Sequence, residues 1–115
     1  MAGLLARLFG QKAQDISPQE AYKRYFAVDE PALIVDVRQP VEYRAGTIPG
    51  AMLIPLTELG QRMAELPQKR QILTICRSSH RSPIAARQLK KAGYDVLNVS
   101  GGMQGWEMAG LPLKK

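Results

Sequence analysis

The sequence predicts a single α/β domain built on a parallel sheet with helices on both faces. Short apolar segments alternate with segments that have helical start and stop signals, as in strand–helix–strand units. The apolar segments are continuous instead of alternating with polar residues, which is typical of strands buried on both faces. A chain of 115 residues is long enough for about one domain, and it contains no repeats or low-complexity segments.

The first helix and strand have clear boundaries. Residues 17–20, SPQE, form a capping box with proline at the first helical position, so we expect a helix through Tyr25 that ends before Pro31. The next segment, ALIVDV at residues 32–37, contains β-branched residues and a single acid. It predicts a strand that is buried on both faces.

The middle of the chain repeats this alternation. We expect a short helix at residues 40–45, a second strand in AMLIPL at residues 51–56, and a third strand in QILTI at residues 71–75. Between the second and third strands, Thr57 is expected to cap a helix that runs to about Leu66.

The last part of the chain holds two more helices and one more strand. Ser82 as N-cap and Pro83 at the first helical position predict a helix through residue 92, which Gly93 ends. A fourth strand is expected at residues 94–99, a turn at the glycine pair 101–102, and a short helix at residues 103–108.

The formal net charge of +6 fits three kinds of partner, namely nucleic acid, a membrane surface or a small anion. The basic residues are spread along the chain, without an RNP-like pattern of aromatic residues and glycine and without zinc-finger spacing. We therefore expect no nucleic-acid partner and favour a small anionic substrate. A single cysteine cannot form an internal disulfide, so an oxidising compartment is not implied and we expect a cytoplasmic protein.

Residues 1–13 are expected to form an amphipathic helix or extension ahead of a domain at residues 14–115. Leu4, Leu5, Leu8 and Phe9 lie on one face at helical spacing, and Arg7 makes the segment too polar for a membrane span or signal peptide. Such a helix would dock on its own domain or make a homodimer. The alternatives are a contact with a membrane surface or a partner, and a frayed terminus.

The segment from Cys76 to Arg81, CRSSHR, holds the only cysteine and the only histidine of the chain. It joins a predicted strand to a predicted helix, so its backbone N–H groups and the positive end of the helix dipole can form an anion cradle. Such surroundings, with Arg77 and Arg81 nearby, favour a reactive thiolate. A buried and inert cysteine is the alternative.

The residues of this loop do not fit two other kinds of site, a zinc site and a cysteine phosphatase site. A zinc site needs at least three protein ligands, so we expect no metal and no other cofactor. A cysteine phosphatase would have five residues between cysteine and arginine, which places the arginine at position 82, where this chain has Ser82. The loop here is one residue shorter and should enclose a smaller atom than a phosphoryl group.

Three motifs in order resemble the single-domain rhodaneses, which are thiosulfate or persulfide sulfurtransferases: DVRQPVEYRAGTIPGA from Asp36, the loop CRSSHRS, and GGMQGW near the end. The resemblance implies a five-stranded parallel sheet whose first strand lies around Asp15 and Ile16. It also implies a persulfide on Cys76, with the donor anion bound by the loop residues Arg77, Ser78, Ser79, His80, Arg81 and Ser82.

The implied partners are a small anionic sulfur donor, such as thiosulfate or a persulfide, and an acceptor that is cyanide, a thiol or a protein. The alternative is a non-catalytic rhodanese-like module that binds partners or senses redox state. Two positions depart from the family pattern. Ser79 replaces a usual glycine, which would cost about 1 kcal/mol if φ there is positive. Thr47 replaces a usual histidine.

Most of the other residues considered for the site are expected to be structural. Asp36 is interpreted as a hydrogen-bonded carboxylate at a strand end, and Arg38 with Glu42 as a pair that braces the active side. His80 is expected to be exposed, where it could favour an anion or simply be solvated. Trp106 is expected to pack in the core beneath the loop.

Overall fold

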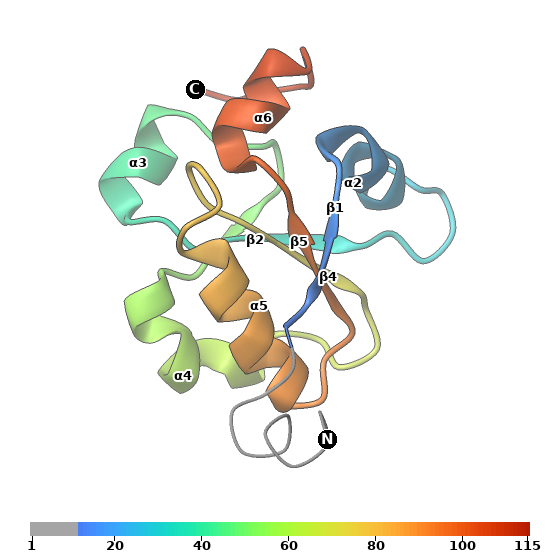
Figure 1. Cartoon of the computed structure of the whole chain (residues 1–115), viewed down its shortest axis with the longest axis vertical. Coiled ribbons are helices and arrows are strands. Elements are labelled where there is room, and N and C mark those ends of the chain that lie inside the picture. The colour runs from blue at the N-terminus through green and yellow to red at the C-terminus, as the bar shows by residue number, and fades with distance from the viewer. Residues whose placement is uncertain (1–11) are drawn as a thin grey trace.

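The computed structural model describes residues 12–115, so the expected helix at residues 1–13 lies almost entirely outside the described residues. Within residues 12–115, five parallel strands form one sheet in the order β1-β5-β4-β2-β3 (Figure 1). This confirms the predicted five-stranded parallel α/β fold. The strands are β1 (Gln14–Ile16), β2 (Leu33–Asp36), β3 (Met52–Leu53), β4 (Ile72–Ile75) and β5 (Val96–Val99).

Helices cover both faces of the sheet. Helices α2 (Pro18–Tyr25) and α6 (Gly102–Met108) lie on one face, and α4 (Leu59–Arg62) and α5 (Ser82–Lys91) on the other (Figure 1). The short α3 (Pro40–Ala45) follows β2 at the edge of the molecule. No helix within residues 12–115 is long and apolar enough to cross a membrane.

The core consists of two clusters, one on each face of the sheet. Successive strand residues point to opposite faces, so Ile34 packs with Trp106 of α6, whereas its neighbour Val35 packs with Leu89 of α5. All four side chains are fully buried. Each contributes about 1.5–3 kcal/mol by leaving water, which explains why the central strands consist mostly of apolar residues.

Helix α2 begins as the capping pattern predicts, because Ser17 Oγ accepts a hydrogen bond of 3.1 Å from the Glu20 N–H. Helix α5 ends at Gly93, which has φ of 98°, and Tyr94 N–H then donates back to Leu89 O at 3.1 Å. Because Tyr94 closes this helix, strand β5 begins at Val96 and the prediction of a strand from residue 94 is too long.

Two predicted helix caps and a second strand length are wrong. The strand at residues 51–56 shrinks to β3, because Leu56 N–H donates to Val37 O and starts a 3-10 turn at Leu56–Glu58. Thr57 therefore lies inside that turn and caps nothing. The expected continuous helix is a 3-10 turn, α4, and a second 3-10 turn at Met63–Glu65. Ser82 is the first residue of α5, and Arg81 occupies the N-cap position.

The strand register determines which loops meet. Asp36 at the end of β2 is paired with Ile75 at the end of β4, and Val37 N–H donates to Ile75 O at 3.0 Å. Residues 36–38 and Cys76 therefore leave the sheet at the same carboxyl edge. Ligands of open α/β sheets bind at this edge.

Candidate active site

Cys76 is fully buried at the carboxyl end of β4, in the core cluster that includes α5. Its Sγ lies 3.3 Å from Ser82 Oγ. Burial raises the pKa of the thiol, but hydrogen bonds from the Ser82 hydroxyl and from the N–H groups of Ser82, Arg81 and Ser78 outweigh it. The net effect lowers the pKa of Cys76, which favours the thiolate that reacts as a nucleophile.

A buried threonine of strand β4 helps to hold the start of α5, and with it Ser82, in place. Thr74 Oγ1 lies 3.2 Å from Ser82 O and 3.2 Å from Asn98 Oδ1, so it links the start of α5 to strand β5. Asn98 in turn donates to Asp15 Oδ1 at 2.9 Å. Sequence reasoning missed this role of Thr74, although a polar residue inside the apolar segment QILTI is a signal for a buried hydrogen bond.

Helix α6 is hydrogen-bonded to the backbone of the Cys76 loop, which we define as residues 76–82. Met103 N–H donates to Cys76 O at 2.7 Å, and Gln104 N–H donates to Arg77 O at 3.1 Å. Gly102 makes this approach possible, since a Cβ at that position would lie 2.5 Å from Cys76 O. The sequence pattern indicated only a turn at the glycine pair, and it missed this close contact.

Ser79 has a φ of 69°, the left-handed conformation that favours glycine. Its side chain provides compensating bonds, because Oγ accepts a 2.8 Å hydrogen bond from Gly101 N–H and donates to Val99 O at 3.5 Å. The serine that replaces the usual loop glycine therefore ties the Cys76 loop to the turn before α6. A glycine could make neither bond.

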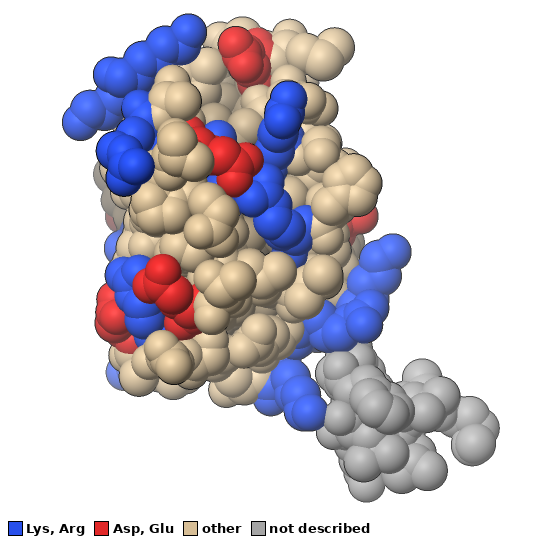
Figure 2. Space-filling view, turned by 90° about the vertical axis from the view of Figure 1, so that its left-hand side faces the viewer, with Lys and Arg blue, Asp and Glu red and all other residues tan. Residues whose placement is uncertain are grey.

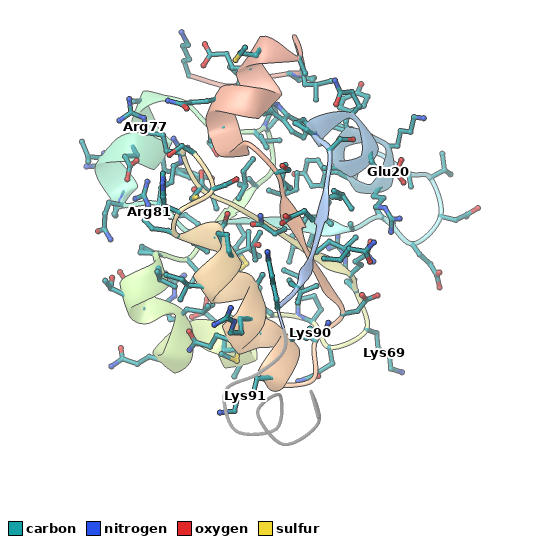
Figure 3. The ribbon with its side chains drawn as sticks, in the orientation of Figure 1. Glu20, Lys69, Arg77, Arg81, Lys90 and Lys91 are labelled. Carbon is teal, nitrogen blue, oxygen red and sulfur yellow. The ribbon has the colours of Figure 1, made fainter. Side chains whose placement is uncertain are left out.

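The two loop arginines differ in their contacts. Arg77 is exposed, and its side chain forms no hydrogen bond or ion pair within residues 12–115. Arg81, by contrast, donates to both carboxylate oxygens of Glu42 at 2.6 and 2.9 Å. Both side chains leave the loop on the side of α3 (Figure 3). His80 is exposed, with Nδ1 3.0 Å from Ser78 Oγ.

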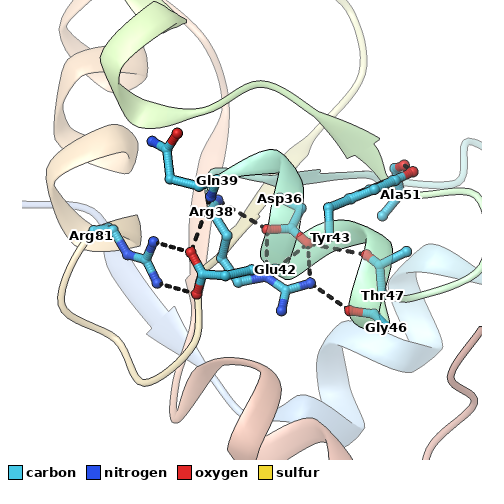
Figure 4. A network of polar contacts seen from close by, with 9 residues as sticks. All are labelled: Asp36, Arg38, Gln39, Glu42, Tyr43, Gly46, Thr47, Ala51 and Arg81. Atoms are coloured by element: carbon cyan, nitrogen blue, oxygen red, sulfur yellow. Dashed lines mark hydrogen bonds and ion pairs between the residues drawn. The ribbon is translucent and has the colours of Figure 1, made fainter. Parts of the chain in front are cut away.

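A network of polar contacts joins the end of β2 to α3 (Figure 4). Arg38 Nη2 lies 2.7 Å from Asp36 Oδ2, and the two side chains are only 8% and 0% exposed. The same guanidinium donates to Gly46 O at 2.7 Å, and Thr47 Oγ1 donates to Asp36 Oδ2 at 3.0 Å. Asp36 is thus a buried carboxylate that accepts hydrogen bonds from both Arg38 and Thr47.

Arg38 and Glu42 are not paired with each other, because each bonds a different residue. Arg38 pairs with Asp36, and Glu42 pairs with Arg81 of the Cys76 loop. The hydrogen bond from Arg81, together with one from Gln39 N–H, lowers the pKa of Glu42 to about 2. Glu42 therefore stays ionised at neutral pH and holds the loop against α3.

Trp106 lies inside the core cluster of α2 and α6 and is fully buried. Its indole N–H donates to Pro112 O at 2.8 Å, and its ring lies 6.2 Å from that of Tyr22. These contacts confirm that Trp106 is a packing residue.

Within residues 12–115 no three His, Cys, Asp or Glu side chains gather into a group that could hold a metal ion.

The family model of the rhodanese-like domain matches residues 14–109, a range that contains every site residue described above. The chain belongs to the rhodanese family. A solved rhodanese-related protein of Thermoplasma volcanium superimposes on it with a TM-score of 0.81 and 29% identity, covering 88% of this chain and 97% of that one. The fold of this rhodanese-like domain is therefore that of solved family members.

Curated relatives of this rhodanese-like domain include a sulfurtransferase of Allochromatium vinosum, 39% identical over 82% of this chain and 89% of its own length. A putative sulfur carrier protein of Bacillus subtilis is 44% identical over 76% of the chain, and an HTH-type transcriptional regulator of Mycobacterium tuberculosis is 39% identical over 94%. The matched regions span about half, 48%, of each of these last two proteins.

Proposed function

We propose that this chain is a sulfurtransferase in which Cys76 carries sulfane sulfur as a persulfide. The observation that carries the proposal is the position of the Cys76 sulfur, which is buried at the carboxyl end of β4, 3.3 Å from Ser82 Oγ. The Ser82 hydroxyl and the N–H groups of Ser78, Arg81 and Ser82 lower the pKa of this thiol against the effect of burial. These donors stabilise negative charge at that position without reorganisation during the reaction. Relatives named as a sulfurtransferase and a putative sulfur carrier support the same assignment.

The first step is nucleophilic attack by the Cys76 thiolate on the outer sulfur of thiosulfate or a related persulfide donor. A bond forms between the two sulfur atoms, the sulfur–sulfur bond of thiosulfate breaks, and its electron pair leaves with sulfite. The enzyme now holds a persulfide anion, whose terminal sulfur replaces the thiolate as the charged atom. No external oxidant or reductant is needed.

The second step returns the enzyme to its starting state. An acceptor thiolate or cyanide attacks the terminal sulfur of the persulfide, the bond to Cys76 Sγ breaks, and the thiolate of Cys76 leaves. The donors of the Cys76 loop stabilise it as they did before the reaction. The products are an acceptor persulfide or thiocyanate.

The loop side chains have different roles in this proposal. Arg77 supplies an exposed positive charge that attracts the anionic donor. Arg81 acts as a positioning residue, because its guanidinium is engaged by Glu42 and its N–H faces the sulfur. Ser78, Ser79 and His80 complete the rim, with Ser79 holding the loop conformation.

The decisive experiment is mass spectrometry of the intact protein after treatment with thiosulfate, followed by removal of excess donor. We expect a gain of one sulfur atom, release of that sulfur as thiocyanate on addition of cyanide, and neither event in Cys76→Ser. Serine keeps the size of the side chain and loses the soft nucleophile. Circular dichroism should show an unchanged fold for this variant.

Aryl phosphate hydrolysis tests the rival reaction on the same samples. The loop has four residues between Cys76 and Arg81, which gives little room for three phosphoryl oxygens that all need donors. We expect no phosphate release by the wild-type protein. Phosphatase turnover without persulfide would replace the sulfurtransferase assignment, and a folded protein with neither reaction would indicate a non-catalytic binding module.

A further inference from the structure

Two adjoining hollows between α3 and α6 form one groove beside the Cys76 loop, called the α3–α6 groove here. Their volumes are about 340 and 220 Å³, so the larger is at the lower end of the range for small-molecule sites and the smaller is below that range. Both are lined by Arg38, Glu42, Ala45, Met103 and Glu107; the larger also reaches Arg77 and Gln104, and the smaller Gly46, Leu113 and Lys115.

Two charged side chains of this groove are already neutralised within the fold. The guanidinium of Arg38 is held by Asp36, and the carboxylate of Glu42 is held by Arg81. Arg77 and Glu107 differ from them, because both are exposed and neither side chain forms a hydrogen bond or ion pair within residues 12–115. One positive and one negative charge without a protein partner among residues 12–115 therefore line the larger hollow.

The groove is structurally connected to the nucleophile. Arg77 directly follows Cys76, and the N–H groups of Met103 and Gln104 donate to the carbonyl oxygens of Cys76 and Arg77. Glu107 lies four residues beyond Met103, about one helical turn or 5–6 Å farther along α6. The positive charge is thus at the loop end of the groove, and the negative charge lies about one turn away from it.

Space and surface character also suit a small ligand. Met103, which is 7% exposed, and Ala45 add apolar surface to a lining that is otherwise polar or charged. The face seen in Figure 2 carries acidic and basic side chains close together, without a large area of a single sign. A ligand with both charges matches this surface better than a ligand with one charge.

Another hollow, of about 600 Å³ and lined in part by Glu30 and Asp95, lies at the amino ends of the strands. It is therefore at the opposite edge of the sheet from Cys76.

We propose that the α3–α6 groove binds the sulfur acceptor, and that this acceptor is a small zwitterionic thiol of the amino-acid type. Its carboxylate contacts Arg77, its ammonium group contacts Glu107, and its thiol is brought to the persulfide on Cys76. The inference rests on the proposed sulfur transfer, for which it specifies the acceptor class. Exposed ion pairs are weak, so each charge should change the transfer rate by up to about fivefold.

The first experiment measures discharge of a persulfide that has been formed with thiosulfate and freed of donor. Four acceptors are compared at rates normalised to their thiolate concentration: cysteine, cysteine methyl ester, N-acetylcysteine and N-acetylcysteine methyl ester. These carry both charges, the ammonium alone, the carboxylate alone and neither. We expect cysteine to react fastest and the doubly blocked compound slowest. Equal normalised rates for all four would overturn the proposal.

Variants assign each charge to its contact. In Glu107→Gln the higher normalised rate of cysteine relative to N-acetylcysteine should disappear, because these two acceptors differ in charge only at the ammonium group, which is expected to contact Glu107. The advantage of N-acetylcysteine over its methyl ester should remain, since Arg77 is unchanged. Glu30→Gln removes the same charge at the opposite end of the sheet and serves as the matched control, with wild-type ratios. A Glu107→Gln variant with wild-type ratios would contradict the assignment.

Binding is tested separately with S-methylcysteine, which carries both charges and cannot accept sulfur. In Cys76→Ser, its addition should shift the backbone amide NMR signals of residues 103–107, and Glu107→Gln should weaken the effect. An absence of shifts at millimolar ligand would overturn the proposal, even if the wild-type protein forms a persulfide with thiosulfate. Shifts in Cys76→Ser, with no persulfide formed by the wild-type protein, would support ligand binding in the groove and refute the proposed sulfur transfer. The two failures are therefore distinguishable.

Discussion

The two sides of the candidate active site are held in different ways. The α3 wall, which we define as Asp36, Arg38 and Glu42, is built on an ion pair between Arg38 and Asp36 with 8% and 0% side-chain exposure. The Cys76 loop is held mainly by hydrogen bonds to its backbone from α6, and by a serine with φ of 69°. One contact joins the two, the Arg81–Glu42 pair, with 32% and 27% exposure.

This difference indicates which part serves stability and which serves chemistry. Removing one partner of a buried ion pair costs about 3–5 kcal/mol, because the remaining charge is left without compensation. A single neutral hydrogen bond contributes about 0.5–1.5 kcal/mol. Changes to the Arg38–Asp36 pair of the α3 wall should therefore act mainly on folding, whereas changes to the Cys76 loop should act on the reactivity of the sulfur while the fold persists.

Arg38→Met should have the largest effect on stability. It leaves the Asp36 carboxylate buried without its cation, and we expect the free energy of unfolding to fall by about 3–5 kcal/mol in urea titrations. The double variant Asp36→Leu with Arg38→Met removes both charges and should recover part of the loss. If the single variant lost less than about 1 kcal/mol, the Arg38–Asp36 ion pair would not be the main source of stability in the α3 wall.

Gly102→Ala tests the contact between α6 and the loop. A Cβ at Gly102 would lie 2.5 Å from Cys76 O and 2.6 Å from the carbonyl of Arg77, at φ of 60°. We expect a loss of about 2–4 kcal/mol in stability, with at least about tenfold slower persulfide formation. Gly110→Ala is the matched control, since its φ is 73° and nothing lies within 4 Å. Equal losses in both variants would mean that backbone strain alone explains the effect.

Ser82→Ala should act on chemistry more than on stability. It removes the hydroxyl bond that lowers the pKa of Cys76, so the thiolate should form only at higher pH. A hydrogen bond to a charged group contributes about 1.5–3 kcal/mol, and persulfide formation at neutral pH should slow about tenfold or more. The pH profile of this rate should move upward while the rate at high pH recovers. An unmoved profile would exclude Ser82 as a stabiliser of the thiolate.

Two variants at Ser79 distinguish the effect of backbone strain on stability from the effect of the side-chain hydrogen bonds. Ser79→Ala keeps the left-handed backbone and loses the bonds to Gly101 N–H and Val99 O, so we expect a loss of about 1 kcal/mol. Ser79→Gly loses the same bonds and removes about 1 kcal/mol of strain, so its stability should be close to that of the wild type. Thermal unfolding of both variants measures the difference. A glycine variant as unstable as the alanine variant would mean that the strain is absent.

Glu42→Gln tests the contact between the wall and the loop and should have the smallest effect on stability. The pKa of Glu42 in the folded protein, about 2, is below its ordinary value of 4.5, so the ionised form stabilises the fold above pH 4.5. We expect the variant to lose about 0.5–1 kcal/mol at neutral pH. The difference from the wild type should shrink as the pH falls from 4.5 to 2, where Glu42 becomes protonated. A difference that does not depend on pH would rule out the ion pair as its source.

The sequence by itself was sufficient for most of the fold. Four of the five strands, the starts of α2 and α3 and the end of α5 were predictable, because apolar segments, prolines and glycines act within a few residues of their position. It also placed Cys76 in a loop between a strand and a helix. Strand β1 has only three residues and follows no apolar pattern, so the family resemblance was needed to expect it.

The tertiary structure decided what the loop residues do. Arg77 and Arg81 look equivalent in the sequence, yet Arg81 is bound by Glu42, 39 residues earlier, while Arg77 is exposed beside the α3–α6 groove. The packing of Gly102 against Cys76 O and the bond from Thr47 to Asp36 are equally invisible in the sequence. These contacts join residues that are far apart along the chain. Only the strand register and the packing of α3 and α6 bring their atoms within bonding distance.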